Sequence, residues 1–513
     1  MNQNHLEKFL PDLAEFREKL MAFEQKDLTV AQYKSFSGGF GSYAQRGGER
    51  HMLRLRLPGG VISKENLAFI VDACEKYQID LIKFTTCQSI QLHNLNATDL
   101  TELIEEAWNA GMISRGGGGD FPRNVMATPL SGVRDGEPFD VQPYAKAAGQ
   151  YLMNFIQAVK FPRKLKVCFS NSTENEVHAT FRDLGFVANP DHTFTVYAAG
   201  GLGNNPSLGV KMAEQVEPSK ILYYIKAMVD TFVAHGNYEN RGRSRTRYLK
   251  DTLGVEGLQK AYQEMLVKAM EENQLDLTLE DTVITKTEDG VRVSHPRITA
   301  QKQNGLYALY YHPIAGQPTS EKLSEISKAI ADMDDVELRL TPDSGVYIIN
   351  LTGSEAEKLL AITEDGANSL FETSICCIGA SICQVGLGNS PALLQSCIEA
   401  VRKENFANGV LPRIKISGCP SSCGAHQVGT IGFRGAMKQT PDGPKPAFAI
   451  FVGGNQKQNC EKLADMGKSI TVDEIPKFLV ELGKMISAEN TTYDKWILEN
   501  ENNLMSLIEK YTA

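Results

Sequence analysis

Apolar residues recur along most of the 513-residue chain at spacings that predict regular secondary structure. Short β-branched or alternating apolar runs predict strands at 51–57, 80–85, 88–93, 165–170, 194–199, 306–311, 336–341, 345–350, 412–417 and 447–452. Apolar spacing close to that of an α-helix predicts helices at 5–24, 63–76, 98–110, 142–158, 218–236, 255–272, 320–332, 354–362, 390–403 and 474–487. The interleaving of the two kinds of element predicts mixed α+β units.

The chain contains its own pattern twice. A shift of 256 positions superimposes Gly60 on Gly316 and Leu95 on Leu351, and both segments read as strand, Gly/Pro turn, helix and strand. Later in each copy, FPRKLKVCFS from Phe161 matches LPRIKISGCP from Leu411, and FTVYAAGG matches FAIFVGG. Matches that keep their order and register indicate an internal duplication, with halves of roughly 36–250 and 300–480.

Composition narrows the class of protein. Apolar residues make up 42% and charged residues 22%, as in ordinary globular proteins. No run of about 18 apolar residues is present, and the polar, amphipathic N-terminus lacks the basic start and apolar core of a secretory signal, so we expect a cytoplasmic protein with no membrane partner. The net charge of −9 argues against nucleic acid as a partner and requires a local basic site for any anionic substrate.

Five of the ten cysteines fall between 376 and 423. They form a CCIGASIC run and a GCPSSCG run, and from Cys377 the spacing is C-x5-C followed by C-x3-C. Two thiolate pairs of this kind favour an iron–sulfur cluster over structural zinc, whose knuckles are usually tighter. Zinc and unligated core cysteines remain alternatives. Adjacent residues of an extended segment point to opposite sides, so only one of Cys376 and Cys377 is expected to be a ligand.

Five basic residues that could form one site lie in the first half of the duplication. Arg54 and Arg56 alternate along one predicted strand, Lys164 and Lys166 repeat that spacing, and Arg123 follows a glycine-rich loop. Fixed positive charges of this kind fit an oxyanion site, although exposed strand faces also carry such residues. The run RGRSRTRY from Arg241 is expected to bind cofactor carboxylates or to form a charge network rather than to bind nucleic acid.

The cysteine motifs, together with RLRLPGG and PRKLK upstream, resemble those of the sirohaem-containing sulfite and nitrite reductases, from about Gly38 to about Gly454. The resemblance implies an α+β fold with pseudo-twofold ferredoxin-like half-domains and two α/β lobes of sirohaem/4Fe–4S type. It divides the chain into an N-terminal helical extension (1–35), half-domain A (36–125), a first, basic lobe (126–290), half-domain B (291–370) and a second lobe with the cluster cysteines (371–513).

The same resemblance implies roles for single residues. Cys377, Cys383, Cys419 and Cys423 are expected to hold a 4Fe–4S cluster, with Cys423 also bridging to the sirohaem iron. Arg54, Arg123, Lys164 and Lys166 match the substrate-binding positions, and Lys83, Gln91 and His93 fall in a segment that contacts the haem. His93 could equally be a packed strand histidine. One position departs from the pattern, because Cys87 stands where relatives usually have an arginine that contacts the haem.

These expectations lead to an oxidoreductase that reduces sulfite to sulfide by six electrons. Lys166 favours doubly charged sulfite, because nitrite-type relatives tend to have asparagine there, and nitrite reduction to ammonia by the same site is the alternative. The duplication leaves no room for a flavin or nicotinamide module, so a ferredoxin or a flavoprotein is expected as the electron donor. A non-enzymatic iron–sulfur electron carrier is the remaining alternative, and Cys87 is the feature that favours it.

Overall fold

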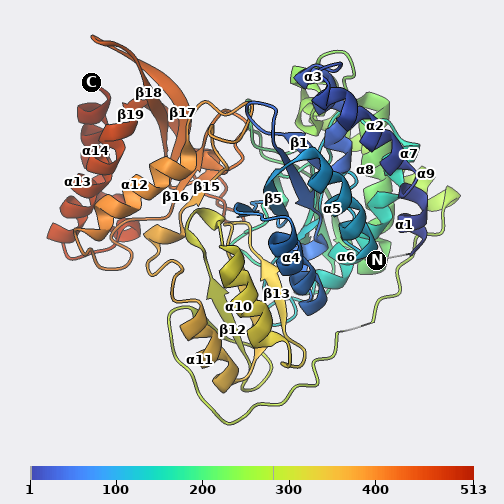
Figure 1. Ribbon diagram of the computed structural model, residues 1–513, viewed down its shortest axis with the longest axis horizontal. Helices are drawn as coiled ribbons and strands as arrows, with labels where there is room; N and C mark the ends of the chain where they lie inside the picture. The colour runs from blue at the N-terminus through green and yellow to red at the C-terminus, as the bar shows by residue number, and fades with distance from the viewer. Residues whose placement is uncertain (1–2, 281) are drawn as a thin grey trace.

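Four β-sheets organise the chain. The computed structural model describes residues 3–280 and 282–513. Two of the sheets belong to the half-domains, and each of the other two forms the sheet of a lobe; in Figure 1 the sheet with β12 and β13 lies at the bottom and the sheet with β15 to β19 at the left. Across the described ranges, no helix has the length and apolar character that crossing a membrane requires.

The two half-domain sheets are built on one plan. The first has the order β1-β2-β5-β4, and α4 and α5 follow β2 and β5 along the chain. The second has the order β11-β12-β14-β13-β3, with α10 and α11 in the corresponding places. The bounds are β1 Ser42–Ala44, β2 His51–Leu55, β3 Val61–Ile62, α4 Lys64–Lys76, β4 Ile82–Phe84, β5 Ile90–Leu95, α5 Ala97–Asn109, β11 Ile298–Ala300, β12 Tyr307–Tyr311, α10 Ser320–Ile330, β13 Glu337–Leu340, β14 Val346–Leu351 and α11 Gly353–Ile362.

The two half-domains share one core, because β3 of the first pairs with β13 of the second, and a single hydrophobic cluster joins residues of both. The duplicated glycines allow this approach. A side chain on Gly60 would meet the carbonyl oxygen of Leu340 at 2.8 Å, and one on Gly316 would meet Lys83 Nζ at 3.1 Å. Both glycines have positive φ, which other residues rarely adopt. The duplication predicted from sequence therefore appears as a physical pseudo-symmetry.

The two lobes repeat a second plan of three parallel strands followed by two antiparallel ones. Their sheets run β6-β7-β8-β9-β10 and β15-β16-β17-β18-β19, with helical structure between the first two strands and two helices after the fifth. The bounds are β6 Met126–Ala127, α6 Gln142–Met153, α7 Phe155–Ala158, β7 Val167–Ser170, β8 Leu184–Ala188, β9 Phe194–Ala198, β10 Val210–Val216, α8 Ile221–His235, α9 Leu249–Glu272, β15 Ile375–Cys376, α12 Ser390–Arg402, β16 Ile414–Ser417, β17 Ile431–Thr440, β18 Gly443–Val452, β19 Asp465–Thr471, α13 Ile475–Ala488 and α14 Tyr493–Thr512. Each lobe has its own hydrophobic core.

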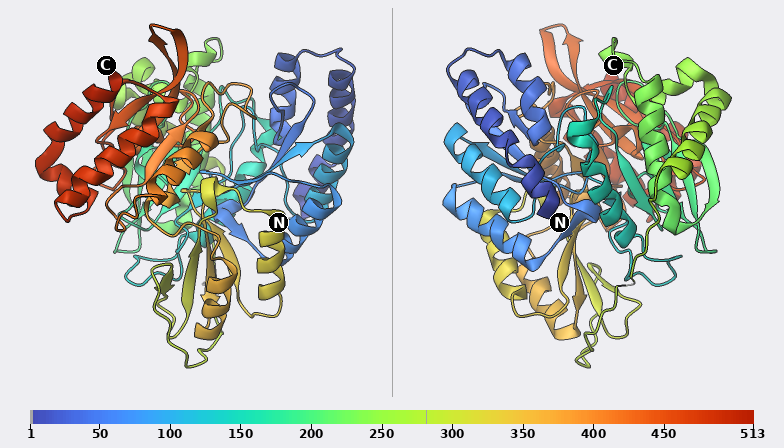
Figure 2. Two further views of the ribbon diagram at one scale, coloured as in Figure 1. Left: turned by 60° about the vertical axis from the view of Figure 1, so that its left-hand side comes forward. Right: turned by 90° about the vertical axis from the view of Figure 1, so that its right-hand side faces the viewer.

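The N-terminal helices pack on half-domain A rather than standing apart, as the further views show (Figure 2). The single helix predicted at 5–24 is divided into α1 (Gln3–Phe9) and α2 (Asp12–Glu24), because Pro11 lacks the N–H that a continuous helix needs. A third helix, α3 (Val30–Ser37), follows. The described residues between 273 and 297 form no helix or strand and run along the outside from the first lobe to half-domain B (Figure 1).

Candidate functional site

The two cysteine motifs lie side by side because their strands are parallel neighbours. Cys376 ends β15 and pairs in register with Ile416 of β16, so the loops that follow the two strands leave the same edge of the sheet. We call residues 377–388 the first cysteine loop and residues 418–424 the second. Gly418 N donates to Cys377 Sγ at 3.1 Å, and Gly388 N donates to Gly418 O at 2.9 Å. The backbone thus joins the loops directly.

Glycines make this close approach possible. A side chain on Gly418 would lie 2.6 Å from the carbonyl oxygen of Gly388, and one on Gly424 would lie 2.1 Å from that of Ile416. Both distances are shorter than non-bonded atoms tolerate, so the second cysteine loop keeps its path only with glycine at these two positions.

The thiols on the two loops fit a multi-iron cluster. Burial raises the pKa of Cys383, with Cys377 and Cys419 adding to the rise. Burial, together with Cys377, raises the pKa of Cys423 to about 12, although this side chain is open to solvent on one side. Among the described residues, no three His, Cys, Asp or Glu side chains come close enough to hold a single metal ion. A cubane holds its four thiolates further apart than a single ion does, and thiolates are its usual ligands.

Cys376 and Cys377 face opposite sides, as adjacent extended residues should. The Cys376 side chain is 1% exposed in the core of the second lobe, where burial raises its pKa to about 11. The Cys377 sulfur faces Ser390 Oγ at 3.0 Å and the second cysteine loop. The geometry therefore places Cys377, and not Cys376, with Cys383, Cys419 and Cys423.

Two arginines of the first half share a backbone acceptor. Arg54 on β2 donates from Nη1 to the carbonyl oxygen of Gly117 at 2.7 Å, and Arg123 donates to the same oxygen at 3.1 Å. Arg123 also donates to Gly119 O at 2.7 Å, while its Nε is buried without a partner. Burial and the nearby Arg54 lower the pKa of Arg123 to about 10. The glycine-rich loop thus holds two guanidinium groups together by its carbonyl oxygens.

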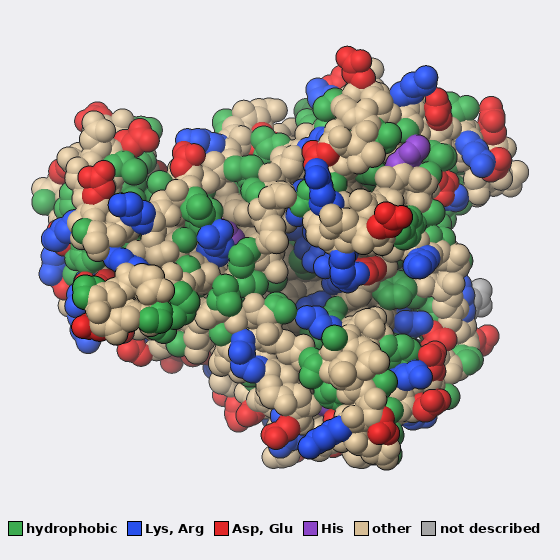
Figure 3. All heavy atoms as spheres, turned by 90° about the horizontal axis from the view of Figure 1, so that it is seen from above, with side chains coloured by type: hydrophobic (Ala, Val, Ile, Leu, Met, Phe, Trp, Pro, Cys, Tyr) green, Lys and Arg blue, Asp and Glu red, His purple; other side chains and the backbone are tan. Residues whose placement is uncertain are grey.

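The lysines complete the group of cations. Within the described ranges, Lys164 Nζ has no hydrogen-bond or ion-pair partner, and burial together with Lys166, Arg245 and Arg123 holds the pKa of Lys164 well below its usual range. Lys166 Nζ donates to Cys87 Sγ at 3.3 Å. We call Arg54, Arg123, Lys164 and Lys166 the basic site. Figure 3 shows Lys and Arg side chains around a hollow near the middle of one face of the molecule.

The basic site and the cysteine loops meet at Cys423. Thr86, in the turn after β4, donates from Oγ1 to the carbonyl oxygen of Cys423 at 2.8 Å. Lys164 and Lys166 both lie near enough to lower the pKa of the Cys423 thiol against the effect of burial. Gln427, just beyond the second cysteine loop, exchanges two hydrogen bonds with Gly203 of the first lobe. The thiolate half and the basic half of the duplication therefore form one composite site.

The three residues predicted to contact the haem lie in different surroundings. Lys83 is 3% exposed and donates to the carbonyl oxygens of Ala315 and Cys376. The Gln91 amide, oriented with its oxygen toward Arg54, accepts from Arg54 Nη2 at 2.6 Å and from Nε at 3.2 Å. His93 is 2% exposed, has one ring nitrogen 3.3 Å from Gln45 Oε1 and leaves the other unpaired. Lys83 and Gln91 thus join or orient protein segments, and contact with a haem stays a prediction for all three.

Arg56, which alternates with Arg54 in the sequence, does not join the basic site. It is 3% exposed, and it donates to the carbonyl oxygens of Arg115, Pro122 and Arg123. β2 ends at Leu55, so the strand alternation that would have placed both arginines on one face does not extend to Arg56.

Tyr43 lies at the basic site although no sequence motif indicates it. Its hydroxyl accepts from Gly119 N at 2.7 Å. Burial would raise the pKa of Tyr43, but Arg123 and Arg54 lower it below its ordinary value. The residue reaches the site because β1 pairs with β2, with Tyr43 opposite Met52. That pairing could be recognised only with the strand order known.

The arginines of the basic run from Arg241 differ in whether they bind a carboxylate. Arg241 binds Asp120 and Arg245 binds the fully buried Asp183, which accounts for a charge network. Arg247 has no carboxylate in hydrogen-bond contact within the described ranges; it donates to Leu202 O at 3.3 Å and leaves Nε unpaired and buried. Arg247 also borders Gly201 and Gly203, so an anionic group of a cofactor could reach it beside the second cysteine loop.

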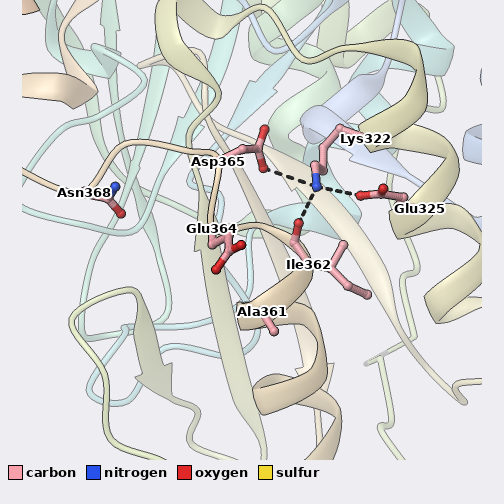
Figure 4. Close-up of a pocket in the computed structure, with 7 residues that line it drawn as sticks. All are labelled: Lys322, Glu325, Ala361, Ile362, Glu364, Asp365 and Asn368. Carbon is pink, nitrogen blue, oxygen red and sulfur yellow. Dashed lines mark hydrogen bonds and ion pairs between the residues drawn. The ribbon is translucent and has the colours of Figure 1, made fainter.

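A separate surface depression of about 820 Å³ lies away from this site. Its lining includes Lys322, Glu325 and Asp365 from the region of α10 and the end of α11, and Lys322 bridges the two carboxylates (Figure 4). The lining has a single cation, Lys322, which is already paired with two of the carboxylates, and none of the lining residues belongs to the cysteine loops or to the basic site.

Comparisons with known proteins agree with this composite site. The family described as "Nitrite and sulphite reductase 4Fe-4S domain" matches residues 118–270, and the "Nitrite/Sulfite reductase ferredoxin-like half domain" matches residues 43–108 and 299–365. Together these matches cover more than half of the chain. The half-domain model matches two separate segments of the chain, which confirms the predicted duplication and fold.

Similar proteins include reductases of both substrates. The chain is 28% identical over 459 residues to a ferredoxin–nitrite reductase of Synechococcus elongatus, covering 84% of this chain and 85% of that protein. A chloroplastic ferredoxin–nitrite reductase of Betula pendula is 27% identical, with 79% and 71% covered. The "Sulfite reductase [ferredoxin] 1" of Mycolicibacterium paratuberculosis is 23% identical, with 79% and 73% covered.

A solved structure has the same fold. The Mycobacterium tuberculosis NirA protein matches with a TM-score of 0.76 at 19% identity, and the match covers 95% of this chain and 94% of that one. The domain matches, the similar reductases and the thiol arrangement together exclude the zinc-stapled module that the cysteine spacing left open. The chain therefore belongs to the family of nitrite and sulfite reductases, which are oxidoreductases that use a 4Fe–4S cluster and sirohaem.

Proposed function

We propose that the chain reduces a small oxyanion by six electrons, with sulfite reduced to sulfide as the preferred reaction and nitrite to ammonia as the alternative. The observation that supports this most directly is the unpartnered ammonium of Lys164 beside Arg54, Arg123 and Lys166, next to the Cys423 thiol. Lys164 is half-buried among other cations, and a cation without a counter-ion in such surroundings is unfavourable, so its presence indicates an anionic ligand.

Each chain residue has a proposed task in this reaction. Cys377, Cys383, Cys419 and Cys423 would hold the 4Fe–4S cluster, and Cys423 would also serve the sirohaem. When bound, these two groups supply the electrons. Arg54 and Arg123, fixed by the carbonyl oxygen of Gly117, orient the oxyanion through charge-assisted hydrogen bonds.

Protons are the second requirement, because every oxygen that leaves the substrate departs as water. Lys164 and Lys166 are the proposed donors. Burial and mutual repulsion lower the pKa of Lys164, which makes its ammonium a stronger acid at neutral pH than an exposed lysine. Tyr43, held at the same site by Gly119 N, provides a further hydroxyl there.

Replacing Lys166 with asparagine is expected to shift preference toward nitrite. Sulfite carries a second negative charge, so it loses more Coulomb energy than nitrite when one cation is removed. At about pH 5, where the Cys87 thiol beside Lys166 is protonated, we expect the ratio of kcat/KM for sulfite to kcat/KM for nitrite to fall about tenfold. Steady-state turnover with reduced methyl viologen measures both values, and an unchanged ratio would rule out Lys166 as the basis of a sulfite preference.

The proposed electron donor is a ferredoxin, which the similar reductases are named for. We propose that it docks on the first cysteine loop. Val385 and Leu387 of this loop are 50% and 60% exposed beside Cys383, and the exposed Arg46 donates to the carbonyl oxygens of Cys383 and Gly386 at 3.1 and 2.7 Å. Exposed apolar side chains next to a cation suit an acidic carrier that must approach the cluster ligands.

Leu387→Asp tests this docking site. The introduced carboxylate would meet an acidic carrier at the apolar contact, so we expect KM for reduced ferredoxin to rise about tenfold. Turnover with methyl viologen, which needs no protein docking, should change by less than about twofold. Leu498→Asp provides the control, because Leu498 on α14 is 82% exposed and far from the loop in sequence. Equal effects of both substitutions on KM would contradict the proposal.

A further inference from the structure

Cys87 lies at the tip of a firmly held turn between β4 and β5. Thr85 N donates to Ser89 O and Gln88 N to Thr85 O, both at 3.0 Å, and Gln88 adopts a positive φ of 52°. Asn124 Nδ2 donates to the carbonyl oxygen of Cys87 at 3.1 Å. These contacts fix the backbone, so the position of the Cys87 sulfur is set by the fold.

The Cys87 sulfur is the hydrogen-bond partner of Lys166. Lys166 Nζ approaches Sγ at 3.3 Å, and within the described ranges this ammonium has neither another hydrogen bond nor an ion pair with a carboxylate. Of the two lysines of the basic site, Lys166 is therefore held by a sulfur, whereas Lys164 has no hydrogen-bond partner among the described residues. The turn also reaches the second cysteine loop, because the neighbouring Thr86 binds the carbonyl oxygen of Cys423.

Within the described ranges, the charged groups that act on the Cys87 thiol are the cations Lys166, Arg182 and Arg54, and the carboxylate of Asp183 accepts from the backbone N–H of Lys166. Its apolar neighbours come from β6, the segment before β8, β8 and β9. The titratable and charged groups around it are Arg54 on β2, Arg123 before β6, Lys166 and Cys168 at β7, Arg182 before β8 and Tyr197 on β9. Burial alone would raise the pKa of Cys87, but Lys166, Arg182 and Arg54 lower it to about 6.

We propose that Cys87 sets the substrate preference of the basic site through Lys166. When the sulfur is ionised it neutralises Lys166 and leaves three effective cations, which favours a singly charged anion such as nitrite. When the sulfur is protonated, four cations face the substrate, which favours doubly charged sulfite. Cys87 is thus a positioning residue that acts through Lys166. This inference rests on the proposed function and confines its preference for sulfite to pH values at which Cys87 is protonated, with the preference moving toward nitrite above them.

The direction in which pH changes the substrate preference follows from the ionisation of the Cys87 thiol. Above its pKa Cys87 is a thiolate, so raising the pH lowers the net charge of the basic site and penalises sulfite relative to nitrite. Sulfite itself also gains charge as the pH rises, because hydrogen sulfite loses its remaining proton. That change is a property of the substrate, so it cancels when the sulfite/nitrite ratio of a variant is divided by that of the wild type at the same pH.

The test uses the holoenzyme, reduced methyl viologen and three substitutions. Cys87→Ser removes the ionisable sulfur and Cys87→Asp fixes a negative charge, while Cys460→Ser changes an exposed thiol elsewhere and serves as the control. At about pH 8, we expect Cys87→Ser to raise the sulfite/nitrite ratio of kcat/KM about fivefold over wild type. At about pH 5, where the wild-type sulfur is protonated, the same variant should differ by less than about twofold. The sulfite/nitrite ratio of Cys87→Asp should equal that of the wild type at the higher pH. At the lower pH it should be smaller than the wild-type ratio.

Three results would overturn the inference. One is an unchanged ratio in Cys87→Ser at the higher pH. Another is an equal change at both pH values, which would indicate a structural effect. The third is a sulfite/nitrite ratio of Cys87→Asp that equals the wild-type ratio at every pH. If Cys87→Ser binds its cofactors poorly, the Cys87→Asp variant alone tests the inference. Failure of the proposed function is distinct, because the wild type would then turn over neither anion.

Discussion

Cys377→Ala is expected to abolish the 4Fe–4S cluster, whereas Cys376→Ala, one residue away, is expected to leave it in place. The Cys377 sulfur receives Gly418 N at 3.1 Å and faces the second cysteine loop. The Cys376 side chain is 1% exposed in the apolar core of the second lobe. A cluster that loses one of its four thiolates is no longer held, because the ligand set supplies both its binding energy and its charge balance.

Iron and acid-labile sulfide analysis of anaerobically purified protein measures this difference. We expect the Cys377→Ala protein to retain less than about a tenth of the wild-type content and to lose turnover by at least about a thousandfold. Cys376→Ala should keep the wild-type content and lose only about 1–2 kcal/mol of unfolding free energy, as a small cavity in a core does. Loss of iron from Cys376→Ala together with its retention in Cys377→Ala would reverse the assignment of the first ligand.

Lys164→Met is expected to lower kcat/KM about a hundredfold or more for both sulfite and nitrite while leaving the cofactor spectrum unchanged. The ammonium of Lys164 makes no hydrogen bond within the described ranges, so its removal frees no protein partner. Lys160→Met is the control, because Lys160 is an exposed lysine four residues earlier on the same segment. Steady-state turnover with each anion measures the loss.

Thermal unfolding separates a functional role of Lys164 from a structural one. The folded state lowers the pKa of Lys164 below its unfolded value, so the ionisation of this lysine opposes folding at pH values below its unfolded pKa. Lys164→Met should therefore have a Tm no lower than the wild type. In the duplicated half the equivalent position is occupied by Ile414, which is fully buried in the core of the second lobe. A large drop in Tm with a proportional loss of activity would contradict the proposed role.

Features that depend on local sequence were predictable. The duplication was visible because both copies need the same special backbone conformations: Asn94 and Asn350, related by the shift of 256 positions, have φ values of 61° and 63°. The cysteine motifs were visible because ligand spacing is a local property. Ranges predicted as strands, such as 165–170 and 194–199, contain β7 and β9, since alternation and β-branched residues mark them directly.

Features that depend on contacts between distant segments were not predictable. The pairing of β3 with β13 joins two short strands from different halves, and the sequence of neither strand indicates which strand it pairs with. Arg56 and Arg54 looked equivalent from their spacing. Because β2 ends before Arg56, however, its side chain donates hydrogen bonds to three backbone carbonyl oxygens instead. The contact of Cys87 with Lys166 joins residues 79 positions apart, so the sequence showed only that an unusual cysteine was present.

The most direct test of the account is the electron stoichiometry of turnover by the anaerobically purified holoenzyme with reduced methyl viologen. Sulfite and nitrite are supplied in separate reactions, and oxidised viologen is counted against the sulfide or ammonia released. The account predicts six electrons per product molecule with both anions, and a higher kcat/KM for sulfite when Cys87 is protonated. Protein that contains the cluster and sirohaem but releases neither sulfide nor ammonia would contradict it.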